Sequence, residues 1–327
     1  MKKFLNIFVI SFALVFSTST FANKIGVIYD SGGKFDKSFN ELAYNTALRV
    51  KDELGWDMIE FEAANNTQIE QGMRKVADRG ATLVVAMGFA QADAVAAIAP
   101  QYPDVNFVAV DVCWVDDPAG NIYQACYKEH EGSFLVGMIA AMASKSGTIG
   151  FVGGMDIPLI RKFQGGYEQG AQYVNPDIEI HANMTGTTPE AWNNPTKGAE
   201  LTKAQIDKGA DVVYQAAGGT GIGVLQAAAD AGIMGIGVDT NQNWMHPGTM
   251  LTSMLKRLDL TIFEQAEKTV AGTFEPSGKF LSLGLAEGMV GYATQDGMVT
   301  DEMVAAVEAA AAEIVSGSLA VADWSQE

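Results

Sequence analysis

The sequence predicts an α/β protein made of two similar lobes, each built on a doubly wound and mainly parallel sheet. Short apolar runs rich in β-branched residues alternate with longer segments whose apolar residues recur three and four apart. This alternation is typical of a parallel sheet with helices on both faces. The order of patterns then restarts in the second half of the chain, which indicates a duplicated fold.

In the first half, the expected elements follow one another in regular order. Strand patterns occur in KIGVIYD (24–30), MIEFEA (58–63), TLVVAMG (82–88) and NFVAVDV (106–112). Helical patterns occur in LAYNTALRVKDELG (42–55), IEQGMRKVADRG (69–80) and ADAVAAIAPQYP (92–103). Each helical segment connects two strands, so the strands are expected to lie parallel.

Three segments of the second half repeat segments of the first half. TIGFVGG (148–154) matches the first strand, DKGADVVYQAAGG (207–219) matches DRGATLVVAMGF (78–89), and GIGVDT (235–240) matches FVAVDV (107–112). The matching segments occur in the same order in both halves, and each pair is separated by nearly the same number of residues. We therefore expect one lobe from residues 23–128 plus about 253–282, and a second from 129–252 plus about 283–327, joined by a hinge near 128–146.

The N-terminus has the pattern of a secretory signal peptide over residues 1–22. MKK precedes the apolar run FLNIFVISFALVF, and Thr20-Phe21-Ala22 resembles a cleavage end. The apolar run is shorter than the roughly 20 residues that span a bilayer, which favours a removed signal over a membrane anchor. With no cysteine near this junction, we expect a freely diffusing protein, periplasmic if the source is Gram-negative.

The charge and the two cysteines limit the possible partners and cross-links. A formal net charge of −18 opposes binding to nucleic acid or anionic lipid, which require clustered Lys and Arg. Cys113 and Cys126 end two consecutive apolar runs, in a chain expected to reach an oxidising compartment. If those runs form neighbouring strands, the sulfurs can meet. The sequence alone leaves a disulfide and two free thiols open, because it does not set the distance between them.

Candidate binding residues follow the expected strands. In doubly wound sheets, ligands lie beyond the carboxyl ends of the strands, so two facing lobes would enclose a cleft. The loop DSGGKFDKSFNE (30–41) holds Asp36, Phe39 and Asn40 at such a place. The other residues expected to face the cleft are Gly88, Phe89, Asp111, Gly153, Gly154, Gly218 to Gly221 and Asp239.

The sequence contains no complete catalytic or cofactor-binding motif. GGTGIG (218–223) opens a helix after a strand and precedes Asp239, as in a dinucleotide site, but Val224 stands where the third small residue belongs. His130, His181 and His246 show no metal-ligand spacing. No nucleophile elbow or phosphate loop occurs. We therefore expect no cofactor, no metal and no enzymatic activity, but a receptor that binds a ligand.

Six motifs in order resemble those of a known family, from about Lys24 to about Gly317. They are DSGGKFDKSFNE (30–41), EGSFLVG (131–137), FVGGMDIPLIRKFQGGYEQG (151–170), AAGGTGIG (216–223), GVDTNQ (237–242) and TSMLKR (252–257). The chain resembles the basic membrane protein type of substrate-binding protein, the purine nucleoside receptors of ABC transporters. The resemblance implies the type I periplasmic-binding-protein fold.

The resemblance also implies roles for particular residues. A purine would lie between the rings of Phe39 and Trp192, the latter in TTPEAWNNPTKG (187–198), and Asp36 would bind the base. The groups implied to complete the site are Asn40 and Asp111 near the base, and Asp239, Lys256 and the backbone of Gly218 around the ribose. Phe35 replaces a common Asn and Trp192 a common Phe, so the preferred base stays open.

The implied mechanism is capture of a nucleoside by closure of the lobes, followed by docking of a monomer on a membrane permease driven by ATPase subunits. Two alternatives remain at this point. A sugar or autoinducer receptor of the same fold would also use aromatic rings. A nucleoside hydrolase or phosphorylase is opposed by the lack of a metal or phosphate motif.

Overall fold

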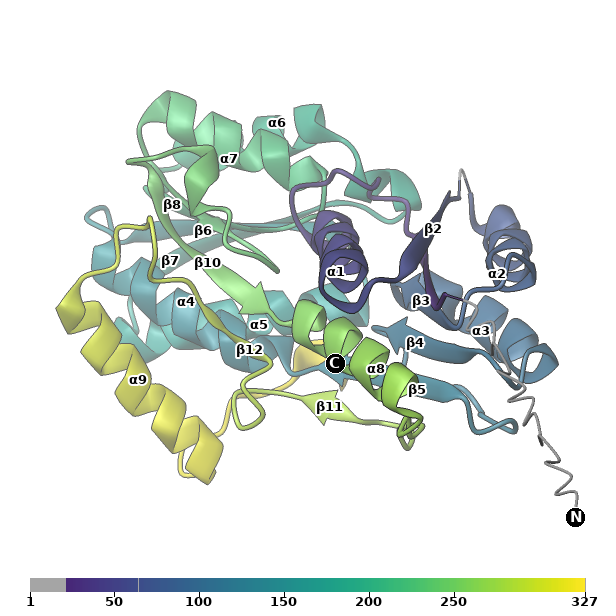
Figure 1. Ribbon diagram of the computed structural model, residues 1–327. Helices are drawn as coiled ribbons and strands as arrows, with labels where there is room; N and C mark the ends of the chain where they lie inside the picture. The colour runs from purple at the N-terminus through teal and green to yellow at the C-terminus, as the bar shows by residue number, and fades with distance from the viewer. Residues whose placement is uncertain (1–21, 64, 327) are drawn as a thin grey trace, which may run out of the picture.

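The computed structural model describes residues 22–63 and 65–326, and it has two six-stranded sheets (Figure 1). The predicted signal peptide, apart from Ala22, lies outside the described residues. The first sheet has the strand order β11-β5-β4-β3-β1-β2 and the second β12-β10-β9-β8-β6-β7. The equivalent orders confirm the predicted duplicated α/β fold.

The first lobe lies on the right in Figure 1 and has parallel strands throughout the described sheet. Its strands are β1 (Lys24–Tyr29), β2 (Asp57–Glu62), β3 (Leu83–Met87), β4 (Asn106–Val110), β5 (Ile122–Tyr127) and β11 (Ser282–Leu283). Its helices are α1 (Phe39–Leu54), α2 (Ile69–Asp78), α3 (Ala92–Ile98) and α8 (Leu258–Ala271). Helix α8 packs on α1.

The second lobe repeats this plan, with β12 antiparallel to β10 at its edge. Its strands are β6 (Thr148–Met155), β7 (Glu179–Gly186), β8 (Val212–Ala216), β9 (Met234–Gly237), β10 (Met250–Lys256) and β12 (Val290–Tyr292). Its helices are α4 (Glu129–Ala143), α5 (Pro158–Val174), α6 (Pro195–Ile206), α7 (Thr220–Ala231) and α9 (Asp301–Ser316). Short 3₁₀ turns include η4 (Pro189–Trp192), η5 (Asn243–Met245) and η6 (Trp324–Gln326).

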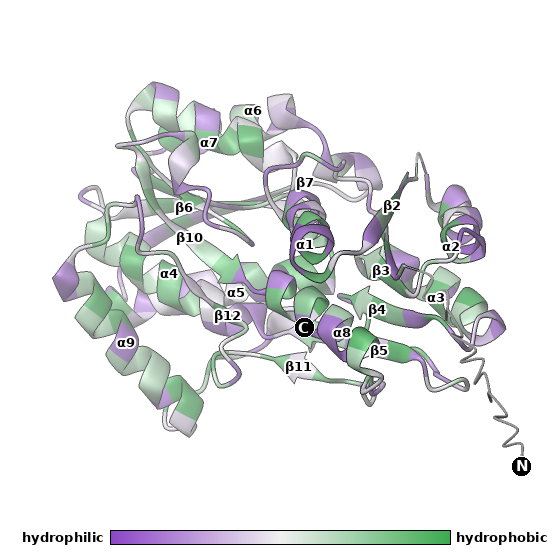
Figure 2. Cartoon of the chain, viewed as in Figure 1, coloured by the Kyte–Doolittle hydropathy of each residue, from purple (hydrophilic) through white to green (hydrophobic). Residues whose placement is uncertain are grey.

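The inner strands are apolar on both faces because helices cover both sides of each sheet. In β3, Leu83, Val85 and Met87 pack in the largest core cluster, whereas Val84 and Ala86 pack in a separate cluster on the opposite face. The helices show both hydrophilic and hydrophobic residues, as amphipathic covers do (Figure 2). This pattern explains why continuous apolar runs predicted the inner strands.

The chain passes between the lobes at three places, which together form the hinge. It crosses from β5 to α4, from β10 to α8, and from β11 to β12. Strand β10 stays paired with β12 of the second sheet through Lys256, so the chain leaves this sheet after Lys256. The expected lobe boundary at about 253 stays a prediction. The pairing of β10 with β9 already ends at Ser253, and β12 alone accompanies β10 to the hinge.

The two cysteines are bonded to each other, a pairing that the sequence had left open. Cys113 and Cys126 form a disulfide with Cα atoms 5.7 Å apart, since β4 and β5 are adjacent strands.

Within residues 22–63 and 65–326, every helix is too short or too polar to cross a membrane.

Candidate ligand-binding site

A cavity lies between the two lobes, at the carboxyl ends of their strands. All residues predicted to bind the ligand except Asn40 line it: Asp36, Phe39, Gly88, Phe89, Asp111, Trp192, Gly218, Asp239 and Lys256. Gly153, Gly154 and the stretch from Gly219 to Gly221, which were also expected to face the cleft, are not among the lining residues. The space between the lining atoms is about 520 Å³, part of it open to solvent.

Several lining residues did not stand out in the sequence. Leu159, Ile160 and Phe163, in the first turns of α5, contribute an apolar wall. Their spacing along the helix is that of a core-facing side, so it did not distinguish them from ordinary core residues. The remaining additions are Asp30, Gly32, Ala216, Ala217 and Val238, which belong to strand-end loops already expected to face the cleft.

Asp36 caps the first helix as well as lining the cavity. Its carboxylate accepts hydrogen bonds from the backbone N–H groups of Ser38 (2.9 Å), Asn40 (3.0 Å) and Glu41 (3.1 Å). These are donors that the start of a helix leaves without an intrahelical partner. Burial raises the pKa of Asp36 to about 7, against the lowering effect of these three hydrogen bonds.

Asn40 holds the loop before α1 in shape. Its Nδ2 donates to Asp30 Oδ1 (2.6 Å) and to the carbonyl of Gly33 (3.2 Å), and its Oδ1 accepts from the Asp30 N–H (3.2 Å). The side chain is fully buried behind the cavity wall. Asn40 therefore shapes the site without lining it.

Phe39 and Trp192 reach the cavity from opposite lobes. Phe39 is the first residue of α1, and Trp192 ends the turn η4. The indole lies against Gly154 at the end of β6, where an added Cβ would overlap its ring. On the other side, the Lys256 ammonium lies 5.3 Å from the centre of the Phe39 ring. Both rings are therefore held in place and partly open to the cavity.

Asp111 and Asp239 occupy equivalent positions in the two lobes. Each follows the fourth strand of its βαβ series, β4 or β9, and each has a left-handed backbone, with φ of 61° and 65°. Aspartate tolerates this conformation better than most residues. The shared backbone places both carboxylates, buried, in the wall of one cavity.

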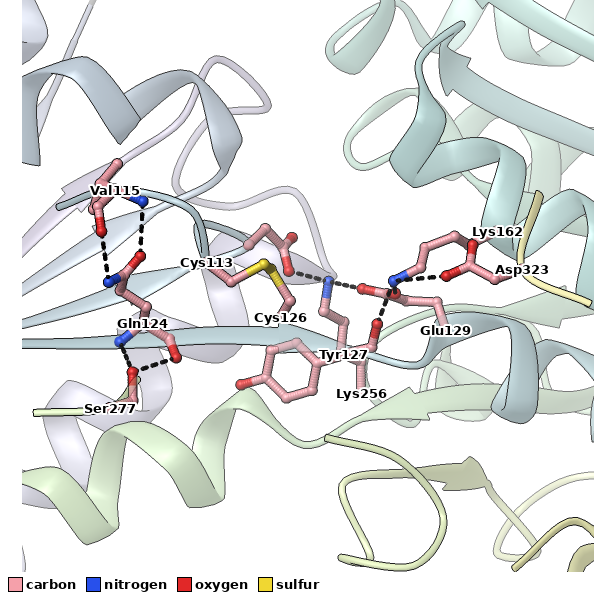
Figure 3. Close-up of a disulfide and its surroundings, with 11 residues drawn as sticks. Cys113, Val115, Gln124, Cys126, Tyr127, Glu129, Lys162, Lys256, Ser277 and Asp323 are labelled. Atoms are coloured by element: carbon pink, nitrogen blue, oxygen red, sulfur yellow. Dashed lines mark hydrogen bonds and ion pairs between the residues drawn. A yellow bond between two sulfur atoms is a disulfide. The ribbon is translucent and has the colours of Figure 1, made fainter. Parts of the chain in front are cut away.

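A chain of buried ion pairs runs from the cavity into the hinge (Figure 3). Lys256 Nζ lies 2.6 Å from Asp111 Oδ1 and 2.9 Å from Glu129 Oε1. The other oxygen of Glu129 lies 3.0 Å from Lys162 Nζ, which also donates to the Tyr127 carbonyl at 2.6 Å. The chain thus joins the end of the first lobe's sheet to α4, α5 and β10 of the second lobe.

The ion pairs set the charge of this end of the cavity. Burial alone would lower the pKa of Lys256, but the carboxylates of Asp111, Glu129 and Asp239 outweigh burial and raise it. Lys256 therefore stays a cation with three N–H donors. Burial raises the pKa of Asp111 to about 6, although Lys256 acts in the opposite direction.

The two lobes also meet directly beside the cavity. Ser38 Oγ of the first lobe donates to Asp239 Oδ2 (2.5 Å) and to the Val238 carbonyl (3.3 Å) of the second. Gln242 Nε2 donates back to the Lys37 carbonyl (2.8 Å). We refer to these contacts among Lys37, Ser38, Val238, Asp239 and Gln242 as the seam. The structure therefore has its lobes closed on each other.

The arrangement suits recognition of a planar, polar and uncharged ligand. It offers aromatic faces, carboxylate acceptors and one ammonium donor in a largely apolar space. His130, His181 and His246 lie outside the cavity lining. Among the described residues, no group of three His, Cys, Asp or Glu side chains is placed to hold a metal ion.

Comparison with known proteins identifies the family. The profile of the Bmp family, described as "ABC transporter substrate-binding protein PnrA-like", matches residues 22–324. The chain belongs to the Bmp family. This Bmp-family protein is therefore an extracytoplasmic substrate-binding protein of an ABC transporter, a class that pairs with permease and ATPase components and is not enzymatic. The resemblance seen in the sequence motifs is confirmed.

Relatives and a solved structure agree with this assignment. The "ABC transporter nucleoside-binding protein BmpA" of Lactococcus lactis is 30% identical, over 91% of this chain and 88% of its own. A solute-binding protein of an ABC transporter system from Aeropyrum pernix superposes with a TM-score of 0.82 and 26% identity, covering 92% of this chain and 93% of that one. The Bmp-family protein therefore shares both sequence and fold with solute receptors.

One of the relatives carries a name that refers to membrane attachment. An uncharacterized protein of Pyrococcus furiosus, 33% identical over 84% of this chain and 71% of its own, is named a lipoprotein. The expectation that this Bmp-family protein diffuses freely rests on residues outside the described part of the chain, so it stays a prediction.

Proposed function

We propose that this protein captures a purine nucleoside outside the cytoplasmic membrane and delivers it to the permease of an ABC importer. The observation that carries this proposal is the pairing of two aromatic residues, Phe39 and Trp192, from opposite lobes in one cavity with a charged end formed by Asp111, Asp239 and Lys256. Rings on both lobes suit a flat base, since stacking uses the π-face of any nucleobase.

The polar groups match the two parts of a nucleoside. Asp36 stands at the wall near Phe39, where a carboxyl group can bond the polar edge of a base. Asp239 and Lys256 supply an acceptor and a donor for the hydroxyl groups of a ribose. The name of the Lactococcus lactis relative supports a nucleoside over other solutes.

Closure of the lobes over the ligand prepares the protein to deliver it to the permease. In this proposal the ligand enters an open form, and the seam forms as the lobes close over it. The closed protein, a freely diffusing monomer in the periplasm, then docks on its permease. No bond in the ligand changes during this cycle.

Calorimetric titration of the mature protein tests the proposal. Inosine, adenosine and guanosine are compared with hypoxanthine, ribose, glucose and galactose. We expect at least one nucleoside to bind more tightly than its base or its sugar alone, because only the nucleoside uses both ends of the cavity. Tighter binding of a free sugar would overturn the proposal in favour of a sugar receptor. Chromatography of the inosine mixture should show no released hypoxanthine, and release would identify a hydrolase.

A further inference from the structure

A second hollow adjoins the ligand cavity at the hinge edge of the lobes. It encloses about 1290 Å³, part of it open to solvent, and its wall is mainly apolar. We call it the side groove and define it by Trp114, Ile157, Pro158, Leu159, Phe280 and Asp323. Phe89, Asp111 and Leu159 line both the side groove and the cavity, so they form the boundary between the two spaces.

Two large aromatic residues of the side groove are unusually exposed. Trp114 is 47% exposed and Phe280 is 73% exposed. Phe280 also has a left-handed backbone, with φ of 63°. A bulky residue in this conformation is a real outlier, and such strain persists where the surrounding structure holds it for a purpose.

The disulfide fixes both aromatic residues on the same wall of the groove. Cys113 directly precedes Trp114, and its carbonyl accepts a hydrogen bond from the Phe280 N–H at 2.6 Å. Cys126 is bonded to Cys113 (Figure 3). The Cys126 N–H donates to the Leu281 carbonyl at 3.2 Å. The segment around Phe280 is therefore tied at two points to the disulfide-linked strands, which holds the strained backbone in place.

The boundary of the side groove lies at the charged end of the cavity. Asp111, one of the shared residues, forms the ion pair with Lys256. In the proposed function, this end holds the ribose, while the base lies at Phe39 and Trp192. The ion pair with Lys256 therefore assigns Asp111 to the ribose end, and not to the neighbourhood of the base that the family resemblance implied. With Asp239 and Lys256 taken up by the two ring hydroxyls, the 5′ position is the part of the ribose that is free to point toward the groove.

We propose that the side groove is a subsite for an apolar or aromatic substituent at the 5′ position of a purine nucleoside. This inference rests on the proposed function and narrows its ligand class to nucleosides modified at that position. Trp114 and Phe280 supply faces on which such a substituent stacks, and Leu159 supplies apolar contact at the boundary. Stacking on one ring changes affinity by about tenfold or more.

The test compares inosine with 5′-O-benzylinosine in calorimetric titrations. The variants are Trp114→Ala and Phe280→Gly, the latter chosen because glycine adopts a positive φ without strain. Trp244→Ala serves as the matched control, since Trp244 is 57% exposed in η5, away from the side groove. Melting temperatures without ligand report whether each variant folds as the unmutated protein does.

We expect the unmutated protein to bind 5′-O-benzylinosine at least as tightly as inosine. Each groove variant should weaken binding of the benzyl derivative by about tenfold or more and leave inosine within about twofold. Trp244→Ala should change neither ligand. If inosine binds and the benzyl derivative binds far more weakly, or if the groove variants leave the derivative unchanged, the subsite is wrong and the proposed function stands. If no nucleoside binds, both proposals fail.

Discussion

Ser38 Oγ donates a hydrogen bond to Asp239 Oδ2 from one lobe to the other, at 2.5 Å. The two residues belong to different lobes, and both are buried in the closed structure. The bond therefore exists only when the lobes are closed. It also occupies one oxygen of Asp239 and leaves the second to the cavity.

Removing this bond should shorten the lifetime of the closed complex. Ser38→Ala takes away a donor to a charged group, an interaction that contributes about 1.5 to 3 kcal/mol. We expect nucleoside affinity to fall by about tenfold or more, mainly through faster dissociation, because the seam is made after the ligand enters. Stopped-flow fluorescence measures both rates. Ser31→Ala in the same loop is the control, and an equal effect of both variants would assign the loss to the loop as a whole.

The sequence predicted most of the cavity because the fold is duplicated. Repeated strand ends marked Gly88, Asp111, Gly218 and Asp239, and parallel strands bring their carboxyl ends to one edge. Phe163 escaped prediction because a residue on an inward helical face looks the same whether it faces core or cavity. Such a distinction depends on how far apart the lobes stand, which no local pattern encodes.

The detailed roles of the first loop were also beyond sequence patterns. Asp36 and Asn40 are close in sequence and equally suited to hydrogen bonding, yet only Asp36 lines the cavity. The difference arises from the turn before α1, which directs Asn40 toward Asp30. Similarly, the crossing after Lys256 depends on how long β10 keeps its sheet partners.

Trp192 should contribute more to ligand binding than to stability. Trp192→Ala removes one stacking face, which is worth about 1 to 3 kcal/mol per base. We expect nucleoside affinity to fall about tenfold or more, with little change in the melting temperature without ligand, because the indole is only partly buried. Calorimetry and thermal unfolding measure the two effects. A large drop in melting temperature with unchanged affinity would show that Trp192 serves the core.

Asp36 should make ligand choice depend on pH. Above its pKa of about 7 the carboxylate accepts a hydrogen bond from the N1–H of hypoxanthine, and below it the protonated form loses acceptor capacity. Inosine affinity should therefore rise with pH through this pKa, whereas adenosine, whose N1 is an acceptor, should show the opposite trend. Titrations one pH unit below and above the pKa measure this. Asp36→Asn should abolish the crossover.

The same pKa shift predicts how stability changes with pH. The folded pKa of Asp36 lies above the value of about 3.9 expected for an unfolded aspartate. Between these two pH values Asp36 is protonated in the folded chain and ionised in the unfolded chain. Its contribution to the free energy of unfolding is therefore fully present below about pH 3.9 and disappears as pH rises through about 7. Urea unfolding of the ligand-free proteins across that range measures the free energy of unfolding. This free energy should fall less with rising pH in Asp36→Asn than in the unmutated protein.

Neutralising Glu129 in the buried ion chain should lower the free energy of unfolding strongly. Its two oxygens lie beside Lys256 and Lys162, and it is fully buried. Glu129→Gln keeps the size of the side chain but leaves excess positive charge, a change that typically costs about 3 to 5 kcal/mol. Urea unfolding measures the loss. Exposed Glu53→Gln is the control, and equal stability of the two variants would contradict the buried role.

Asp239 should select ribose over deoxyribose. With Oδ2 bonded to Ser38, Oδ1 is the oxygen left to accept a hydrogen bond from a ribose hydroxyl. A hydrogen bond to a charged group contributes about 1.5 to 3 kcal/mol, so inosine should bind about one to two orders of magnitude more tightly than 2′-deoxyinosine. Calorimetric titration of the unmutated protein with both ligands measures this ratio.

Asp239→Asn tests the selection of ribose separately from the closure of the lobes. The amide oxygen can still accept from Ser38, so the seam survives, while the group facing the cavity becomes an NH₂ donor and the negative charge is lost. We therefore expect the inosine to 2′-deoxyinosine ratio to shrink, together with inosine affinity, while the melting temperature without ligand changes little. Ser38→Ala should instead weaken both ligands by the same factor, because it acts on closure alone. Equal affinities of the unmutated protein for the two ligands would remove the ribose role from Asp239 and leave it only the contact with Ser38.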